Sequence, residues 1–162
     1  MLKINLKKIL INFIIVLVIF LIDRLSKIYI LQIAELGKNV DIYVTQYLNF
    51  YLIWNKGIAF GLFSFDENFI YNFITFIILT ITIVILVMII KSVRFKKYSL
   101  LLVFGGSLGN LFDRIYYSAV PDFIDIHINN FHWFVFNAAD IFITIGIICL
   151  IFDEIFINNK KI

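Results

Sequence analysis

The sequence predicts a mainly α-helical, polytopic membrane protein with four transmembrane helices and a small extracytoplasmic β-sheet. Hydrophobic residues make up 62% of the 162 residues and charged residues only 15%, whereas a soluble domain is about half apolar. The apolar residues gather in four long segments, and the two connections on one side of them are rich in β-branched and aromatic residues. We expect a single membrane-embedded domain over residues 1–162. This composition excludes an ordinary soluble enzyme, a disordered tail and a basic nucleic-acid-binding domain.

The four apolar segments predict helices at about 9–33, 69–90, 98–117 and 138–157. Each approaches or exceeds the ~20 residues that cross a hydrocarbon core of about 30 Å. Three lysines precede the first segment, as in a signal peptide, but no small-residue cleavage site follows it. We therefore expect the first segment to be an uncleaved span.

Basic residues indicate the orientation of these spans. Nine of the 14 Lys and Arg residues lie before the first span, between the second and third, or at the end of the chain. The positive-inside rule then places both termini in the cytoplasm. The connections at about 38–62 and 118–136 lie outside, and their β-branched and aromatic residues predict strands.

Polar residues collect at the outer ends of the expected spans. Intramembrane carboxylates and amides are costly, so they indicate function by default. Four carboxylates, two asparagines and one arginine can meet at this level: Asp23, Asn110, Asp113, Arg114, Asp122, Asn137 and Asp140.

Simpler structural interpretations exist for several of these residues. Asp113 with Arg114 fits a local ion pair at a span end, and Asp23 with Lys27 fits an i, i+4 pair at the membrane interface. Residues 55–61 (NKGIAFG) fit a glycine turn after a strand. For His127 and His132 we expect exposed or interfacial positions and no metal site, since the sequence places no third ligand near them.

Five segments resemble the ordered motifs of bacterial lipoprotein signal peptidase, also called signal peptidase II. They are residues 23–27 (DRLSK), 55–60 (NKGIAF), 105–114 (GGSLGNLFDR), 120–124 (VPDFI) and 136–140 (FNAAD). The resemblance implies a multi-pass protease of the bacterial inner membrane with Asp122 and Asp140 as its catalytic dyad. The implied substrate is a diacylglyceryl-modified prolipoprotein, cut just before the lipid-modified cysteine. Pro121 departs from the expected pattern and puts the local strand pairing in doubt.

The residues themselves favour the same chemistry. A serine or cysteine nucleophile lacks a partner base in this sequence, whereas two aspartates that share a proton can hydrolyse a peptide without metal or cofactor. We expect membrane lipid as a partner, no nucleic acid, and a monomer as the active form. The residues expected to bind substrate or support the site are Asp23, Lys27, Asn55, Gly57, Phe60, Gly109, Asn110, Asp113, Arg114 and Asn137.

Two other functions fit parts of the sequence. A proton- or ion-coupled carrier also places carboxylates in the membrane, but it would need polar residues near the midplane, and the second segment has almost none. A non-enzymatic membrane subunit could pair its carboxylates with a partner, but it would not need seven convergent polar groups.

Overall fold

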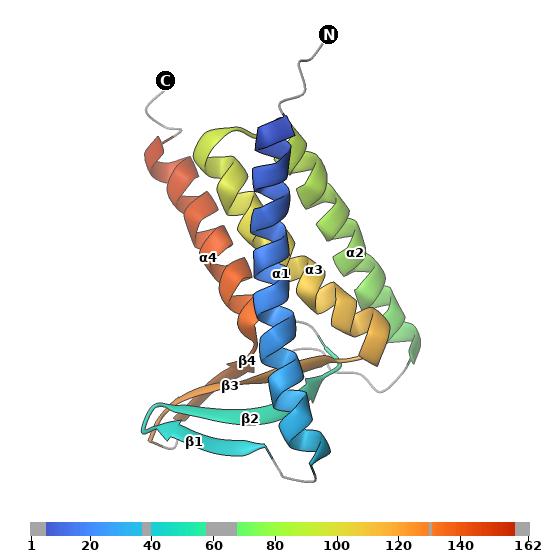
Figure 1. The fold of residues 1–162 in the computed structure, drawn as a ribbon, viewed down its shortest axis with the longest axis vertical. Helices are drawn as coiled ribbons and strands as arrows, with labels where there is room; N and C mark the ends of the chain where they lie inside the picture. The colour runs from blue at the N-terminus through green and yellow to red at the C-terminus, as the bar shows by residue number, and fades with distance from the viewer. Residues whose placement is uncertain (1–5, 37–39, 58–67, 130, 158–162) are drawn as a thin grey trace.

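The computed structural model describes residues 6–36, 40–57, 68–129 and 131–157. Within these ranges the helices are α1 (Leu6–Glu35), α2 (Asn68–Lys91), α3 (Arg94–Tyr117) and α4 (Ala138–Phe152), and a π-helical segment, Asp153–Ile157, continues α4. The strands are β1 (Asp41–Thr45), β2 (Leu48–Asn55), β3 (Val120–Ile128) and β4 (Phe131–Phe136). The prediction of a mainly helical protein with a small sheet is confirmed. The helices form an elongated bundle, with the sheet across one end (Figure 1).

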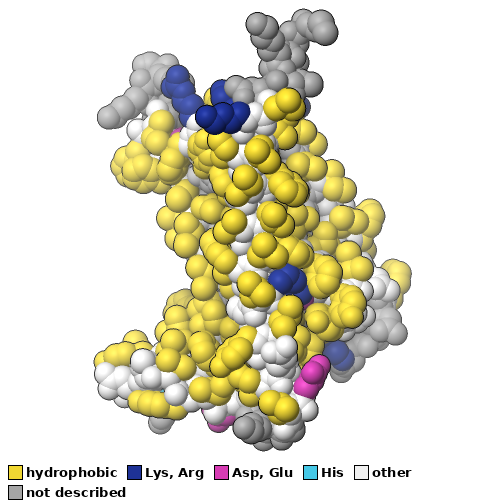
Figure 2. Space-filling model, in the orientation of Figure 1, with side chains coloured by type: hydrophobic (Ala, Val, Ile, Leu, Met, Phe, Trp, Pro, Cys, Tyr) yellow, Lys and Arg dark blue, Asp and Glu magenta, His cyan; other side chains and the backbone are white. Residues whose placement is uncertain are grey.

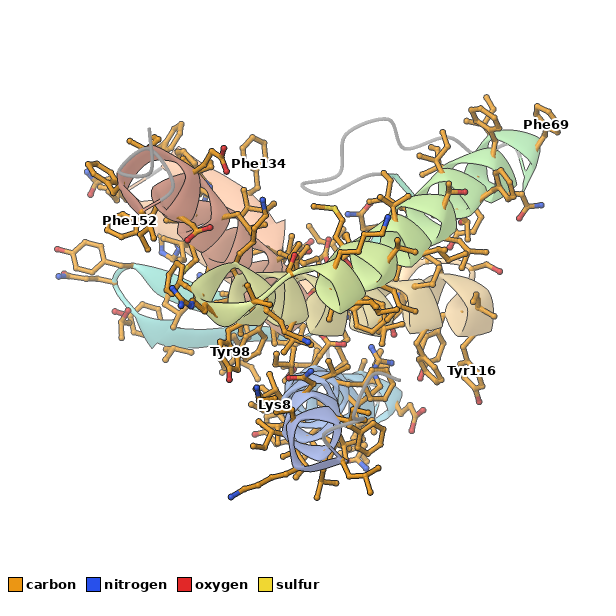
Figure 3. All side chains as sticks on the ribbon, turned by 90° about the horizontal axis from the view of Figure 1, so that it is seen from above. Lys8, Phe69, Tyr98, Tyr116, Phe134 and Phe152 are labelled. Atoms are coloured by element: carbon orange, nitrogen blue, oxygen red, sulfur yellow. The ribbon has the colours of Figure 1, made fainter. Side chains whose placement is uncertain are left out.

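α1 and α2 are each long and apolar enough to cross a membrane. Only 17% of the most apolar stretch of either helix is buried inside the protein, so these are not the core helices of a soluble protein. Hydrophobic side chains cover the visible face of the bundle (Figure 2), and aromatic residues such as Phe69, Tyr116 and Phe152 point away from it (Figure 3). Among the described residues, α3 and α4 do not meet the same criterion of length and apolar composition for a membrane-spanning helix.

α3 is the central helix and packs against the other three. Viewed end-on, it lies between α1 on one side and α2 and α4 on the other (Figure 3). Glycines make the close approach possible, because a Cβ on Gly106 would lie 2.5 Å from the backbone oxygen of Ala139 in α4. Small residues at helix contacts are typical of membrane bundles, where close backbone packing holds the helices together.

The sheet is antiparallel throughout, in the order β1-β2-β3-β4. Its four strands lie within the two connections from which strands were expected. Pro121 lies inside β3, opposite Trp54 of β2, and pairing continues on both sides of it. The expected disruption is therefore wrong. Pro121 is the second residue of its strand, close to a register shift in β2 between Phe50 and Ile53, and proline is tolerated near strand starts and bulges.

α1 connects the bundle to the sheet. Its 30 residues extend about 45 Å, which is longer than a hydrocarbon core. Its last turns pass beside the strands (Figure 1), where Ile30 packs in a buried apolar cluster with Val40 and Phe123. This contact holds β3 against the end of the bundle and so positions the residues that β3 carries.

Candidate active site

A cavity of about 300 Å³ lies where the sheet meets the helices. Its apolar wall comes from two helices that lie on the same side of α3 (Figure 3). α2 contributes Ile78, Ile81 and Thr82, and α4 contributes Ile143, Thr144 and Ile147. Six charged or amide side chains line its other part, together with Ser107 and Val120: Asn55, Asn110, Arg114, Asp122, Asn137 and Asp140. An apolar chamber with a few convergent polar groups is the usual form of a ligand or substrate site.

Asp122 projects into this cavity from β3 and is only 3% exposed. Both of its carboxylate oxygens accept hydrogen bonds from amide side chains. Asn55 Nδ2 donates to Oδ2 at 2.8 Å, and Asn137 Nδ2 donates to Oδ1 at 2.6 Å. The cross-strand position of Asn55, directly opposite Val120, explains how β2 reaches Asp122. No cation lies within ion-pair distance of Asp122 among the described residues.

Asp140 belongs to the first turn of α4, where it completes a capping box with Asn137. The backbone N–H of Asn137 donates to Asp140 Oδ2 at 3.1 Å, and the backbone N–H of Asp140 donates to Asn137 Oδ1 at 3.2 Å. Reciprocal bonds of this kind satisfy the free N–H groups of a helix start. Asn110 Nδ2 of α3 donates to Asp140 Oδ1 at 2.8 Å.

Burial, together with the nearby Asp140 charge, raises the pKa of the Asp122 carboxyl to about 7. The hydrogen bonds from Asn55 and Asn137 act in the opposite direction, because they favour the ionised form. Two carboxyl groups that line one poorly hydrated cavity do not ionise independently. At neutral pH the arrangement therefore favours one proton shared between the two groups.

Next to this cavity lies a second polar group, which we call the buried charge cluster: Asp23, Arg24 and Lys27 of α1 with Asp113 of α3. Lys27 Nζ lies 2.8 Å from Asp23 Oδ1 and 2.6 Å from Asp113 Oδ2. Arg24 lies 2.9 Å from Asp23 Oδ2 and 2.6 Å from Asp113 Oδ1. All four residues are buried. Each carboxylate thus meets two cations, and the cluster has no net charge.

The buried charge cluster corrects two interpretations. Asp113 does not pair locally with Arg114, because on α3 it faces α1 while Arg114 Nη2 donates instead to the Gly57 carbonyl at 2.6 Å. Asp23 and Lys27 do form an i, i+4 pair, but both side chains are fully buried between helices, where Lys27 also contacts Asp113. A single sequence does not show the rotation of α1 and α3 that brings these charges together.

Asn110 connects the buried charge cluster to the cavity. Lys27 Nζ donates to its side-chain oxygen at 2.9 Å, while its Nδ2 donates to Asp140. The backbone also contributes, since the N–H of Ala139 donates to Asp23 Oδ1 at 3.1 Å. Gly109 supports this contact, because a Cβ there would lie 2.5 Å from Asp23 Oδ2. The cluster therefore fixes the start of α4.

The structure brings most of the predicted site residues to these two adjacent groups. Gly57 accepts the bond from Arg114, and its N–H donates to Asn55 Oδ1 at 2.8 Å, so it connects two residues that line the cavity; the rest of the expected glycine turn lies outside the described residues. Phe60 lies outside the described residues. Sequence reasoning missed Arg24 as a member of the cluster, although its position beside Asp23 in a span was a signal. It also missed Thr82, Ser107 and Thr144, which line the cavity and left no signal in the sequence.

The histidines differ from expectation. Asp125 of β3 lies close to both His127 and His132, so a third potential metal ligand is present. The strand register that assembles this group is not evident from the sequence.

Comparison with known proteins gives a consistent result. Residues 15–156 match the profile of the family described as "Signal peptidase (SPase) II". The "Lipoprotein signal peptidase" of Pelagibacter ubique is 58% identical over 159 residues, which cover 98% of this chain and 96% of that protein. The "Lipoprotein signal peptidase" of Anaplasma phagocytophilum is 38% identical over 153 residues, which cover 92% of this chain and 94% of that protein.

The fold is similar to solved structures as well. A chain described as a bacterial membrane enzyme superposes with a TM-score of 0.74 at 29% identity, covering 93% of this chain and 91% of that one. A second structure with the same description gives a TM-score of 0.69 at 28% identity, covering 90% and 93%.

Proposed function

This chain belongs to the signal peptidase II family, and we propose that Asp122 and Asp140 are its catalytic pair. It is a membrane aspartic endopeptidase that removes the signal peptide from diacylglyceryl-modified prolipoproteins, cutting before the lipid-modified cysteine. One observation carries the assignment of the pair. Asp122 and Asp140 line the same cavity and accept hydrogen bonds from amide groups, whereas Asp23 and Asp113 are each ion-paired to two cations.

The chemistry follows from one shared proton. The ionised carboxyl takes a proton from a water molecule, which attacks the scissile carbonyl carbon. The protonated carboxyl donates a hydrogen bond to the carbonyl oxygen and then its proton as the tetrahedral intermediate forms. The first carboxyl, now protonated, gives a proton to the leaving amine as the C–N bond breaks, and the second carboxylate takes back a proton from a hydroxyl of the intermediate, which restores the starting pair.

The amides around the pair keep it oriented. Asn55 and Asn137 occupy both oxygens of Asp122, and Asn110 and the Asn137 backbone hold Asp140. Fixed donors do not have to reorganise during the reaction, and such preorganisation is a major source of catalysis. Lys27 acts one step further away, through Asn110, and so positions the site without touching the reacting atoms.

The cavity suits an apolar substrate. Isoleucines of α2 and α4 form its wall, and we place the signal helix and its acyl chains between these helices. Arg114 Nε and Nη1 have no hydrogen-bond partner among the described residues and can donate to peptide carbonyls of the substrate. We propose a monomer as the active form and surrounding lipid as its partner.

We place the chain, as a single membrane-embedded domain, in the bacterial inner membrane with four spans. α3 has 24 residues and is about 36 Å long. Its polar side chains turn into the protein, so its composition alone underestimates how well this helix fits a membrane span. α4 and the π-helical segment together cover residues 138–157, about 30 Å. α1 begins and α4 ends at the end opposite the sheet (Figure 1), where basic side chains gather (Figure 2). By the positive-inside rule, this distribution of charge supports a cytoplasmic location for both termini.

The activity and its site are tested together with purified protein in detergent. Wild type should cleave a diacylglyceryl-modified precursor and not the same precursor without lipid, and chelator should not change the rate because neither carboxyl requires a metal. Asp122→Asn should bind the lipid-modified precursor without cutting it, since the binding wall is apolar. Cleavage by Asp122→Asn at the wild-type rate would refute the assignment of the pair.

Topology is tested by cysteine labelling in intact cells. The single native cysteine, Cys149, is first replaced by alanine. A cysteine at Gln46, in the exposed turn between β1 and β2, should react with an impermeant reagent. A cysteine at Ser92, between α2 and α3, should react only after the cells are opened. The reverse pattern would contradict the proposed orientation.

A further inference from the structure

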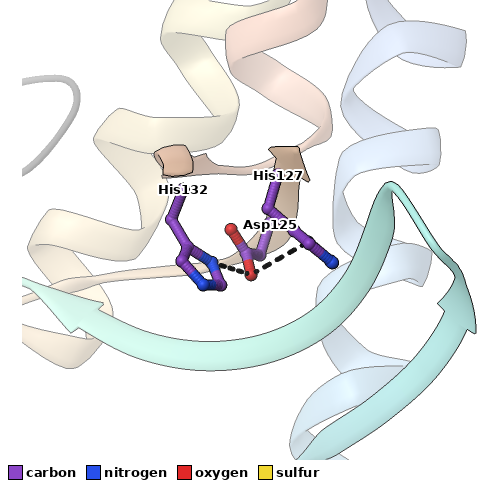
Figure 4. A group of neighbouring side chains, drawn as sticks. All are labelled: Asp125, His127 and His132. Carbon is purple, nitrogen blue, oxygen red and sulfur yellow. Dashed lines mark hydrogen bonds and ion pairs between the residues drawn. The ribbon is translucent and has the colours of Figure 1, made fainter. Parts of the chain in front are cut away.

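The sheet carries a second cluster of ionisable side chains, made of Asp125 and His127 on β3 and His132 on β4 (Figure 4). His132 Nδ1 lies 2.9 Å from Asp125 Oδ2, and His127 Nδ1 lies 3.6 Å from the same oxygen. The two imidazole rings stack with centroids 5.0 Å apart. One potential ligand atom from each residue lies within 4.8 Å of the others.

The strand register builds this cluster. Asp125 and His127 are two residues apart on β3, so their side chains point to the same face of the sheet. His132 is the cross-strand partner of His127. The register shift between Asp125 and His127 marks a bulge, and bulges redirect side chains. Three groups of metal-ligand type thus come from one hairpin, which is a compact support for an ion.

Buried polar atoms at this position lack partners, which is a second and independent observation. Asp125 has a side chain only 6% exposed, and its Oδ1 has no hydrogen-bond partner among the described residues. The same is true of His127 Nδ1 and of Asn49 Oδ1. Asn49 is the direct partner of Asp125 across β2 and β3, and it lines a shared cavity with Asp125 and His132. Buried atoms without a partner are costly, and a cation would satisfy all three.

We propose that Asp125, His127 and His132 bind a divalent transition-metal ion of the Zn²⁺ class, with Asn49 Oδ1 as a neighbouring oxygen. Two imidazoles and one carboxylate are a common protein ligand set for Zn²⁺. Tetrahedral Zn²⁺ holds such ligand atoms about 3.3 Å apart, whereas the present atoms lie within 4.8 Å of one another, so the farthest pair has to approach by up to about 1.5 Å. His132 can make this movement, because its side chain is 57% exposed.

This metal site is separate from the catalytic pair. Asp122 and Asp125 are three residues apart on β3, so they point to opposite faces of the strand, and the two cavities that they line have no lining residue in common. A bound ion would join β3 to β4 and stabilise the hairpin that carries Asp122 and leads into α4. Its effect is therefore on the stability of the folded chain and not on the chemical step.

The test is a metal titration of the full chain, purified in detergent with a tag that contains no histidine. His127 and His132 are the only two histidines in the sequence, so any imidazole-dependent signal reports on this cluster. Co²⁺ should bind with a stoichiometry of one and give visible absorption bands typical of nitrogen and oxygen ligands, and Zn²⁺ should displace it. Zn²⁺ should also raise the thermal unfolding temperature, because it binds the folded chain.

Substitutions test which residues bind the metal ion. His132→Ala and Asp125→Asn should each weaken Zn²⁺ binding at least tenfold, and Zn²⁺ should no longer raise their unfolding temperature. Glu35→Gln, which alters an exposed carboxylate at the end of α1, is the matched control and should bind like wild type. His132→Ala should keep its cleavage activity, which shows that it is folded, and Asp122→Asn should bind Zn²⁺ normally whether or not it is catalytic.

The absence of saturable binding by wild type would overturn the proposal. So would unchanged binding in folded His132→Ala, because the exposed histidine would then not be a ligand.

Discussion

The buried charge cluster and the proposed catalytic pair are neighbours, yet their carboxylates have different partners. Asp23 and Asp113 each lie against Arg24 and Lys27. Asp122 and Asp140 receive hydrogen bonds from asparagine side chains and one backbone N–H. A cation keeps a carboxylate ionised, whereas a neutral amide holds its position and lets it exchange a proton. Under the proposed assignment, ion-paired aspartates are structural and aspartates held by amide groups are reactive.

The largest difference between the two groups of carboxylates is expected in the cleavage activity of their variants. Asp122→Asn and Asp140→Asn should each lower the cleavage rate on the order of 10²–10⁴-fold, the usual contribution of general acid–base catalysis. Their unfolding temperatures should stay near that of wild type, because asparagine keeps the size of the side chain. Cleavage of a lipid-modified precursor and thermal unfolding, measured on the same preparations, check this. A folded variant with near-normal cleavage would remove its aspartate from the pair.

The same substitution in the buried charge cluster should act mainly on stability. Asp113→Asn leaves Arg24 and Lys27 facing only Asp23, and breaking a buried ion pair costs about 3–5 kcal/mol. The protein that still folds should retain part of its activity, since Asp113 does not line the cavity. Denaturant unfolding and the rate per folded molecule separate the two effects. If Asp113→Asn folded normally but were as inactive as Asp140→Asn, the division into structural and reactive carboxylates would be wrong.

Gly109 tests how tightly the cluster is packed. Gly109→Ala should destabilise the protein by about 1–3 kcal/mol, the usual cost of overpacking, because the new Cβ would displace the Asp23 carboxylate. Ile115→Ala serves as a control on the same helix, since Ile115 is 71% exposed. Thermal unfolding of both variants measures the difference. Equal effects would show that the contact between α1 and α3 at Gly109 tolerates a side chain.

The smallest expected effect is a shift in pH dependence. Because the Asp122 pKa is raised to about 7, the shared proton should be lost and cleavage should decline as pH rises through about 7. Asn55→Ala removes a hydrogen bond that lowers the Asp122 pKa, so the decline should move to higher pH. A pH–rate profile of both proteins measures this. A shift to lower pH would contradict the role given to Asn55.

The raised pKa also predicts a direction for stability. The folded chain holds a proton on Asp122 that the unfolded chain releases near its ordinary value of 3.8. This contribution to stability is therefore fully present below about pH 4 and is lost as pH rises through about 7. Asp122→Asn should reduce the decline in unfolding free energy over this interval, which denaturant titrations at several pH values can measure.

Much of the fold could be predicted because membrane spans and strands leave strong local patterns. The apolar segments locate the helices to within a few residues at most of their ends, and β-branched residues locate both hairpins. The partners of individual side chains could not be predicted in the same way. Asp113 contacts α1 and not its neighbour Arg114 because of helix rotation, and Asp125 meets two histidines because of a register shift. Both are properties of packing between elements, which no local pattern encodes.

Asn137 determines the spacing of the two carboxyl groups in the proposed active site. Its side chain donates to Asp122, its backbone donates to Asp140, and its own oxygen caps α4. One residue therefore sets the separation of the two carboxyl groups. α2 supplies only wall residues to the cavity, whereas the groups that hold the two carboxyls lie on β2, on α3 and at the start of α4. If α2 were displaced to admit a substrate helix, these groups would keep the two carboxyls at the same spacing.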